Sequence, residues 1–127
     1  MTAAYVTMTR RSDFVAANRG LRVARPGFVL LAHANGGQGQ RAGITVTKKI
    51  GNAVVRNRMK RRFRALLREM LPALGLADTD HVLIGRENGI ERDFALLRGE
   101  LEAALRRAAE GKGDPPRRKA PSRGKRR

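Results

Sequence analysis

The chain has 127 residues, enough for one domain with a modest aliphatic core, because 41% of them are apolar but only 4% are aromatic. It has no cysteine, which excludes disulfides, thiolate metal sites and cysteine nucleophiles. Its 28 Lys and Arg against 11 Asp and Glu give a net charge of +17, which favours nucleic acid as the partner. No apolar run reaches the ~20 residues of a membrane-spanning helix, and the first residues lack the apolar region of a signal peptide. We therefore expect a cytoplasmic protein that binds no membrane.

The N-terminal third predicts one short helix followed by strands. Ser12 is a candidate helix cap, and Phe14 and Val15 would dock a helix over residues 13–19 that ends at Gly20. Gly-rich residues connect the later strands as a flexible loop. The strands are expected at residues 21–24, 28–33 and 42–48, the last with alternating apolar and polar side chains.

Two amphipathic helices and one more strand follow. Residues 54–71 and 91–110 carry apolar residues at helical spacing, and Pro72 is expected to end the first of these helices. Between them, residues 80–85 predict a short buried strand with Val82 and Ile84 on one face. The order α-β-β-β-α-β-α predicts an α+β fold, an α/β two-layer sandwich with helices against one sheet. The two apolar stripes are Val55, Met59, Phe63, Leu66, Leu67 and Met70, and then Phe94, Leu97, Leu101, Ala104, Leu105 and Ala108.

The C-terminal residues 112–127 differ in composition from the rest of the chain. They contain eight basic residues, three prolines and no large apolar residue. Such a segment cannot bury enough apolar surface to fold alone. We therefore predict a folded domain over residues 1–111 and a disordered basic tail over residues 112–127.

The densest positive charge lies at the start of the first long helix. Residues 56–64 read RNRMKRRFR, so six of these nine residues are basic, and no acid follows until Glu69. The solvated face of an ordinary helix mixes both signs of charge. Here the like charges repel one another, and a row of phosphates would relieve that repulsion. The candidate RNA-binding row at four-residue spacing is Arg56, Lys60, Arg64 and Arg68, with Arg58 and Arg61 further out.

The residues just before this helix add a candidate phosphate site. Lys48 and Lys49 are expected at the end of a strand, and Gly51 permits a sharp turn into the helix. Backbone N–H groups at a helix N-terminus attract anions. Lys48, Lys49 and Asn52 are therefore expected to meet RNA together with the start of the helix.

The segment TVTKKIGNAVVRNRMKRRFR, residues 45–64, resembles the signature of the bacterial ribonuclease P protein family. That signature is a lysine pair, a glycine, Ala-Val, then Arg-Asn-Arg and a Lys-Arg pair. Asp13-Phe14, Phe28-Val29-Leu30 and residues 80–86 resemble further family landmarks in the expected order, so the resemblance covers about residues 9–109. It implies a fold like domain 2 of ribosomal protein S5, with a left-handed βαβ crossover between parallel strands.

The family is the small protein subunit of a ribonucleoprotein whose RNA removes the 5′ leader from precursor tRNA. The resemblance implies that the chain binds the catalytic RNA and the single-stranded leader, as a monomer in a 1:1 complex. It also implies that the RNA cuts with bound Mg²⁺, and that the chain has no catalytic residue and no metal site. Carried over by motif, the RNA-facing residues are Arg56, Asn57, Arg58, Lys60, Arg61 and Arg64. The full predicted RNA-binding set also includes Lys48, Lys49, Asn52 and Arg68. The leader cleft, between the first helix and the sheet, would contain Phe14, Leu31, Thr45 and Thr47.

Two positions depart from the family pattern. Asn18 stands near the place where the family often has a second aromatic residue, and Leu31 stands where a tyrosine is frequent. Stacking of an aromatic side chain on a base contributes ~1–3 kcal/mol. We therefore expect a weaker base-specific grip on the leader and a larger share of contacts to its backbone.

The remaining polar residues do not suggest a protein nuclease. His33 and His81 are the only histidines, and each is interpreted as an incidental surface or strand-edge residue. Asp78 and Asp80 are explained by a turn before a strand. Two alternatives remain, a structural RNA-binding protein such as a small ribosomal protein, and a DNA-binding helix. The second is weaker because only Asn57 offers a side chain suited to reading base edges.

Overall fold

The structure is a computed structural model that describes residues 5–113. These residues form one mixed five-stranded sheet in the order β1-β4-β5-β3-β2. β2 is antiparallel to β3 and β3 to β5, whereas β4 runs parallel to both β5 and β1. The strands are β1 (Val6–Thr7), β2 (Leu21–Arg25), β3 (Phe28–Ala34), β4 (Arg41–Thr45) and β5 (Thr79–Gly85). The predicted tail lies outside the described residues from residue 114 onward, so the boundary at residue 111 stays a prediction.

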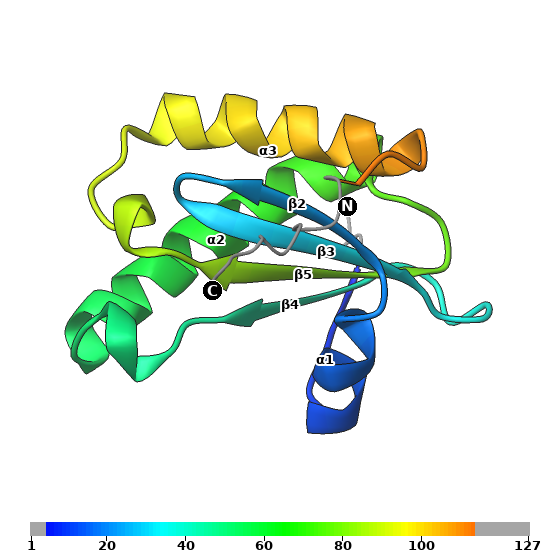
Figure 1. The fold of residues 1–127 in the computed structure, drawn as a ribbon, viewed down its shortest axis with the longest axis horizontal. Coiled ribbons are helices and arrows are strands. Elements are labelled where there is room, and N and C mark those ends of the chain that lie inside the picture. Colours follow the sequence, from blue (N-terminus) through cyan, green and yellow to red (C-terminus); the bar gives the residue numbers. More distant parts are fainter. Residues whose placement is uncertain (1–4, 114–127) are drawn as a thin grey trace, which may run out of the picture.

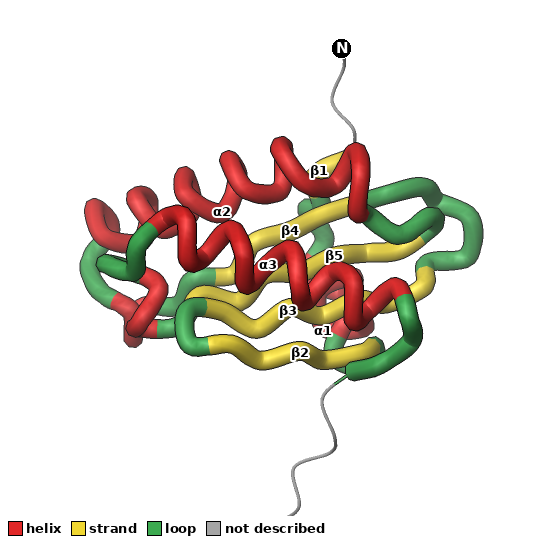
Figure 2. The backbone as a smooth tube through the Cα atoms, turned by 90° about the horizontal axis from the view of Figure 1, so that it is seen from above, coloured by secondary structure: helices red, strands yellow, loops and turns green. Residues whose placement is uncertain are grey.

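The helices cover the two faces of the sheet unequally. α2 (Ala53–Leu74) and α3 (Phe94–Ala109) lie against one face, and α1 (Arg11–Ala17) lies against the other (Figures 1 and 2). Short 3₁₀ helices, η1 (Lys48–Ile50) and η2 (Glu87–Gly89), precede α2 and α3. The predicted α+β sandwich is therefore confirmed, with α1 as a partial third layer. Within the described part of the chain, no helix combines the length and hydrophobicity needed to cross a bilayer.

The alternation of side chains along β3 explains why both faces need cover. Phe28 and Leu30 point into the main core under α2 and α3, whereas Val29 and Leu31 belong to a smaller cluster under α1. A strand buried on both faces reads as a continuous apolar run, as residues 28–32 do. The main core joins the helices to the sheet, and the ring of Phe28 meets Phe63 of α2 edge-to-face with centroids 6.4 Å apart.

The predicted start of the first helix was wrong. α1 begins at Arg11, its N-cap residue is Arg10, and no side chain accepts a capping hydrogen bond there. Ser12 therefore lies in the first turn and does not cap. Val15 also does not dock, because it is 54% exposed. α1 meets the sheet through Phe14 and Ala17, which are three residues apart, and this leaves Val15 on the open flank.

The expectation that Pro72 ends the long helix was also wrong, because α2 continues to Leu74 with the proline inside its last turns. A proline there removes one backbone hydrogen bond. Burial of Leu71 and partial burial of Leu74 in the main core offset this loss, and the N–H of Gly75 still donates to the carbonyl of Leu71. Tertiary packing thus outweighs the local preference of the proline.

α3 begins three residues later than expected. Asp93 caps it, with Oδ2 accepting the N–H of Leu96 at 3.2 Å. The predicted apolar stripe is buried from Leu97 onward, but Phe94 at its start is 40% exposed and does not belong to the core. Its ring lies instead beside the guanidinium of Arg62 on α2, at 5.6 Å from the centroid.

Candidate nucleic-acid interface

α2 carries a long positive surface on the side turned away from the core. Its apolar stripe is buried as predicted from Met59 to Met70, whereas Val55 at its start is only half-buried, and this turns the remaining side chains outward. The residues between Ala53 and Arg68 include no acid. We call the outward cations the basic face of α2. Arg58, Arg61, Arg64 and Arg68 are exposed on it with Asn57, whereas Arg56 and Lys60 are half-buried along its flank.

The turn before α2 differs from its prediction. β4 ends at Thr45, so Lys48 and Lys49 do not end a strand but lie exposed on η1. Gly51 then packs its backbone against Val55, and a methyl group at Gly51 would come within 3.1 Å of that side chain. Asn52 is the helix cap, with Oδ1 accepting the N–H of Val55 at 3.1 Å. Its side-chain oxygen is therefore occupied, and its amide N–H groups are what it can offer to a phosphate.

Arg56 and Arg58, which are predicted to bind RNA, also contact other residues of the protein. Arg56 Nε donates to the carbonyl of Gly51 at 3.1 Å and so fixes the turn before the helix. Arg58 forms an ion pair with Glu91 at 3.5 Å, with both side chains more than half exposed. An exposed pair of this kind contributes little stability and leaves Arg58 accessible to an anion.

Arg62 has a different position from the other cations of the run. Its guanidinium donates to the carbonyls of Ile90 and Arg92 and lies over the ring of Phe94. Its Nε is buried without a partner among the described residues. Arg62 therefore fastens the connection between β5 and α3 onto α2, and it does not belong to the basic face.

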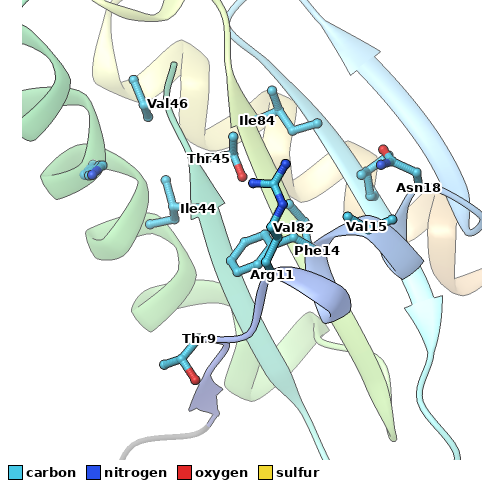
Figure 3. A pocket seen from close by; sticks show the side chains of 12 residues that line it. Thr9, Arg11, Phe14, Val15, Asn18, Ile44, Thr45, Val46, Val82 and Ile84 are labelled. Atoms are coloured by element: carbon cyan, nitrogen blue, oxygen red, sulfur yellow. The ribbon is translucent and has the colours of Figure 1, made fainter. Parts of the chain in front are cut away.

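A groove opens between α1 and the sheet and reaches the flank of α2 (Figure 3). We call it the α1 groove; its volume is about 500 Å³. Phe14, Leu31 and Thr45 line it as the resemblance implies, whereas Thr47 lies beyond the end of β4 and does not. Asn18 also lines it. The remaining lining residues are Thr9, Arg11, Val15, Ile44, Val46, Lys60, Val82 and Ile84.

A smaller hollow of about 230 Å³ continues the α1 groove toward β1. The two hollows share Phe14, Ile44 and Lys60, and the smaller one also reaches Arg64. β1 pairs with β4 only at Arg41 and Ala42, so the rest of this edge of β4 is open to the groove. The groove and the basic face of α2 are therefore continuous through Lys60 and Arg64.

Behind α1 lies a cluster of charges that the sequence did not reveal. Arg41 on β4 donates from Nε and Nη2 to the two carboxylate oxygens of Asp80 at 2.7 and 2.8 Å, and its Nη1 lies 3.5 Å from Asp13 of α1. Asn35 Nδ2 also donates to Asp80 Oδ1, the oxygen that accepts from Arg41 Nε, at 2.9 Å. Burial alone would raise the pKa of Asp80, but the hydrogen bonds from Arg41 and Asn35 bring it below its usual value. Asp80 is thus a buried strand residue, and the turn interpretation was wrong for it, whereas Asp78 does lie in the turn before β5.

His81 was also misread, because it is fully buried in β5. Its Nε2 accepts the N–H of Leu76 at 3.1 Å, so Nδ1 carries the proton and donates to the carbonyl of Arg41, also at 3.1 Å. Burial lowers the pKa of His81, and this outweighs the opposing effects of the Arg41 carbonyl and the Asp80 charge. His33, by contrast, is half-buried near the end of β3.

Among residues 5–113, no three His, Asp or Glu side chains gather closely enough to hold a metal ion. The charged groups behind α1 satisfy one another, as the bidentate pair of Arg41 and Asp80 illustrates. What the surface does offer is a cationic helix face beside a partly apolar groove, an arrangement suited to single-stranded nucleic acid.

The family model described as Ribonuclease P matches residues 3–109. The chain belongs to the ribonuclease P protein family. The ribonuclease P protein component of Erythrobacter litoralis is 76% identical over 119 residues, covering 94% of this chain and 98% of the relative. That of Paramagnetospirillum magneticum is 41% identical over 114 residues, covering 84% and 85%. As a ribonuclease P protein, the chain is a component of the ribonucleoprotein that processes the 5′ end of tRNA, with an RNA as its partner.

Solved structures of ribonuclease P proteins share the fold. The RNase P protein of Staphylococcus aureus superposes with a TM-score of 0.69 at 29% identity, covering 80% of this chain and 94% of that one. The RNase P protein from Thermotoga maritima gives a TM-score of 0.67 at 30% identity, covering 77% and 92%. The parallel β4–α2–β5 unit and the helix pair over one face are therefore features of a known protein fold.

Proposed function

We propose that this chain binds the catalytic RNA of ribonuclease P through the basic face of α2 and the turn before it, and holds the single-stranded 5′ leader of precursor tRNA in the α1 groove. The observation that carries the proposal is the double position of Lys60. It belongs to the cationic row of α2 and also lines the groove. A leader in the groove would therefore lie directly beside RNA on the helix.

The lining of the α1 groove supports a single strand as its ligand. Val15, Ile84 and the ring of Phe14 offer apolar surface for bases, while Arg11 and Lys60 can meet phosphates. A groove of about 500 Å³ is too small to admit a double helix. Because Phe14 is the only aromatic residue in its lining, sugar and phosphate contacts should dominate over base stacking.

We infer that the RNA subunit performs the cleavage with Mg²⁺ that it holds itself. The described residues provide no cluster of carboxylates for the metal. The role of the protein would be to bring the leader and the catalytic RNA together, as a monomer in a 1:1 complex. It would also place positive charge between two polyanions that otherwise repel each other.

Cleavage assays with purified components test this division of roles. The chain, a bacterial ribonuclease P RNA and precursor tRNA are combined at a low Mg²⁺ concentration at which the RNA alone is slow. We expect the chain to accelerate cleavage at the mature 5′ end, and we expect RNA-free chain to leave the substrate intact. Specific cleavage by rigorously RNA-free protein would refute the assignment of catalysis to the RNA. A lack of any acceleration would refute the proposed role of the protein.

A further inference from the structure

α1 forms one wall of the α1 groove, but it buries little of its own surface against the rest of the protein. It has seven residues, a single buried residue, Ala17, and no side-chain cap at its N-terminus. So short a helix is not stable without tertiary contacts. Four of its residues, or residues adjacent to it, nevertheless line the groove: Arg11, Phe14, Val15 and Asn18. The position of this wall must therefore be fixed by contacts that α1 makes with the sheet.

One such contact is the ion pair between Asp13 and Arg41. The guanidinium of Arg41 cannot move freely, because two of its nitrogens bind both oxygens of Asp80, whose side chain is only 3% exposed. The third nitrogen is left to point at Asp13 at 3.5 Å. β5 thus fixes Arg41 on β4, and Arg41 holds the first turn of α1. The planar guanidinium allows this three-way contact, which the single ammonium group of a lysine would not reproduce.

A second contact lies one residue further along α1. The ring of Phe14 sits directly on the backbone of Gly43 in β4, where a Cβ would come within 2.5 Å of Cε1 and Cζ of the ring. Only a residue without a side chain leaves room for the aromatic ring at this height above the sheet. The ring of Phe14 therefore packs on the backbone of Gly43, and the ion pair between the neighbouring Asp13 and Arg41 orients the helix that carries the ring.

We propose that Asp13 is a positioning residue for leader binding, holding α1 through Arg41 so that Phe14 keeps its place in the groove wall. This inference rests on the proposed function of the groove. Asp13 itself would not touch the leader. Its carboxylate faces the guanidinium of Arg41, behind the wall that the leader would contact.

Simple charge arguments predict the opposite result for a substitution of Asp13. Asp13→Asn removes a negative charge from a protein with a net charge of +17, which by itself should tighten RNA binding. If α1 is held by the ion pair, the same substitution should weaken leader binding, because Phe14 is no longer fixed. A matched control is Glu102→Gln, which removes a carboxylate paired with Arg106 at 2.9 Å on α3, on the opposite face of the sheet.

The test measures the affinity of the reconstituted complex of chain and ribonuclease P RNA for precursor tRNA and for mature tRNA without a leader. The ratio of the two affinities reports the leader contacts, and it does not depend on the folded fraction, because both RNAs are measured with the same preparation. We expect Asp13→Asn to lower this ratio by about 1.5- to 5-fold, the range for a partly exposed ion pair. Asp13→Glu should restore most of it, and Glu102→Gln should leave it unchanged or slightly higher.

A double-mutant cycle with Phe14→Ala decides whether Asp13 acts through the ring. In the Phe14→Ala background, Asp13→Asn should have no further effect on the ratio. An unchanged or increased ratio for Asp13→Asn alone would overturn the inference, as would an equal loss in both backgrounds. If Asp13→Asn has no effect while Phe14→Ala lowers the ratio, the positioning role fails and the groove keeps its function. If Phe14→Ala also has no effect, the proposed leader site fails, and the inference fails with it.

Discussion

Phe63 and Arg61 are two residues apart on α2 and should separate folding from binding. Phe63 is fully buried, packs edge-to-face on Phe28 at 6.4 Å and lies against the backbone of Gly85 in β5. Phe63→Ala would open a cavity between α2 and the sheet, and we expect it to cost ~3–5 kcal/mol of unfolding free energy. About 0.5–1.5 kcal/mol of this would be the lost aromatic pair. Because domains of this size have ~5–15 kcal/mol in total, the variant should fold with a reduced margin.

Arg61→Ala is the matched comparison, because Arg61 is exposed on the basic face and has little packing to lose. It should change stability by no more than ~0.5 kcal/mol. It should, however, weaken RNA binding and lower the slope of log affinity against log salt concentration by ~1. Urea unfolding measures the first quantity and salt-dependent RNA titration the second. If Arg61→Ala unfolds the protein while affinity per folded molecule stays the same, the basic face is structural and its proposed role fails.

Three further outcomes follow from the buried charges and the basic C-terminus. Burial lowers the pKa of His81, so the imidazole binds a proton more readily in the unfolded chain than in the folded one, and the melting temperature should decrease as pH falls below ~6.5. His81→Gln should flatten that decline, and an unchanged pH profile in this variant would contradict the role given to His81. Asp80→Asn leaves Arg41 without its bidentate partner and should lower the free energy of unfolding, measured in urea, by ~3 kcal/mol. The control Glu69→Gln breaks an exposed pair with Arg98 and should lower it by less than ~1 kcal/mol. Deletion of residues 112–127 removes eight basic residues and should flatten the salt dependence of RNA binding while the melting temperature is kept; loss of folding would show that the domain extends beyond residue 111.

Local patterns in the sequence were sufficient for the elements with strong periodicity. The stripe from Met59 to Met70 predicted both the helix and its buried face, and the outward position of Arg61 and Arg64 follows from the same spacing. The two-residue strand β1 carries no such pattern and was not predicted. Arg62 could have been recognised, because it follows Met59 by three residues and precedes Leu66 by four. That spacing places it on the flank of the apolar stripe.

The cluster behind α1 was not predictable because its members are far apart in the chain. Arg41 lies 39 residues before Asp80, and their pairing depends on the register of β4 against β5, in which these two residues are direct partners. Asp80 and His81 at the start of an apolar strand were the only local signal, and a turn explained Asp80 while a strand-edge position explained His81 equally well. The contact of the Phe14 ring with Gly43 likewise depends on how α1 docks on the sheet, which no local pattern shows. Sequence patterns could thus suggest the lining of the groove but not the contacts that hold its wall.

The order of strands also has a consequence for how the chain folds during its synthesis. β5 lies between β4 and β3 at the middle of the sheet, yet among the strands of residues 5–113 it is the last to leave the ribosome. Until Thr79–Gly85 has emerged, β3 and β4 have no strand to join them, and the floor of the α1 groove lacks Val82 and Ile84. Long-range pairing of this kind delays folding. A nascent chain that stops before residue 79 should therefore expose its basic helix to cellular RNA without a finished groove, and productive assembly with ribonuclease P RNA should begin only after β5 has inserted.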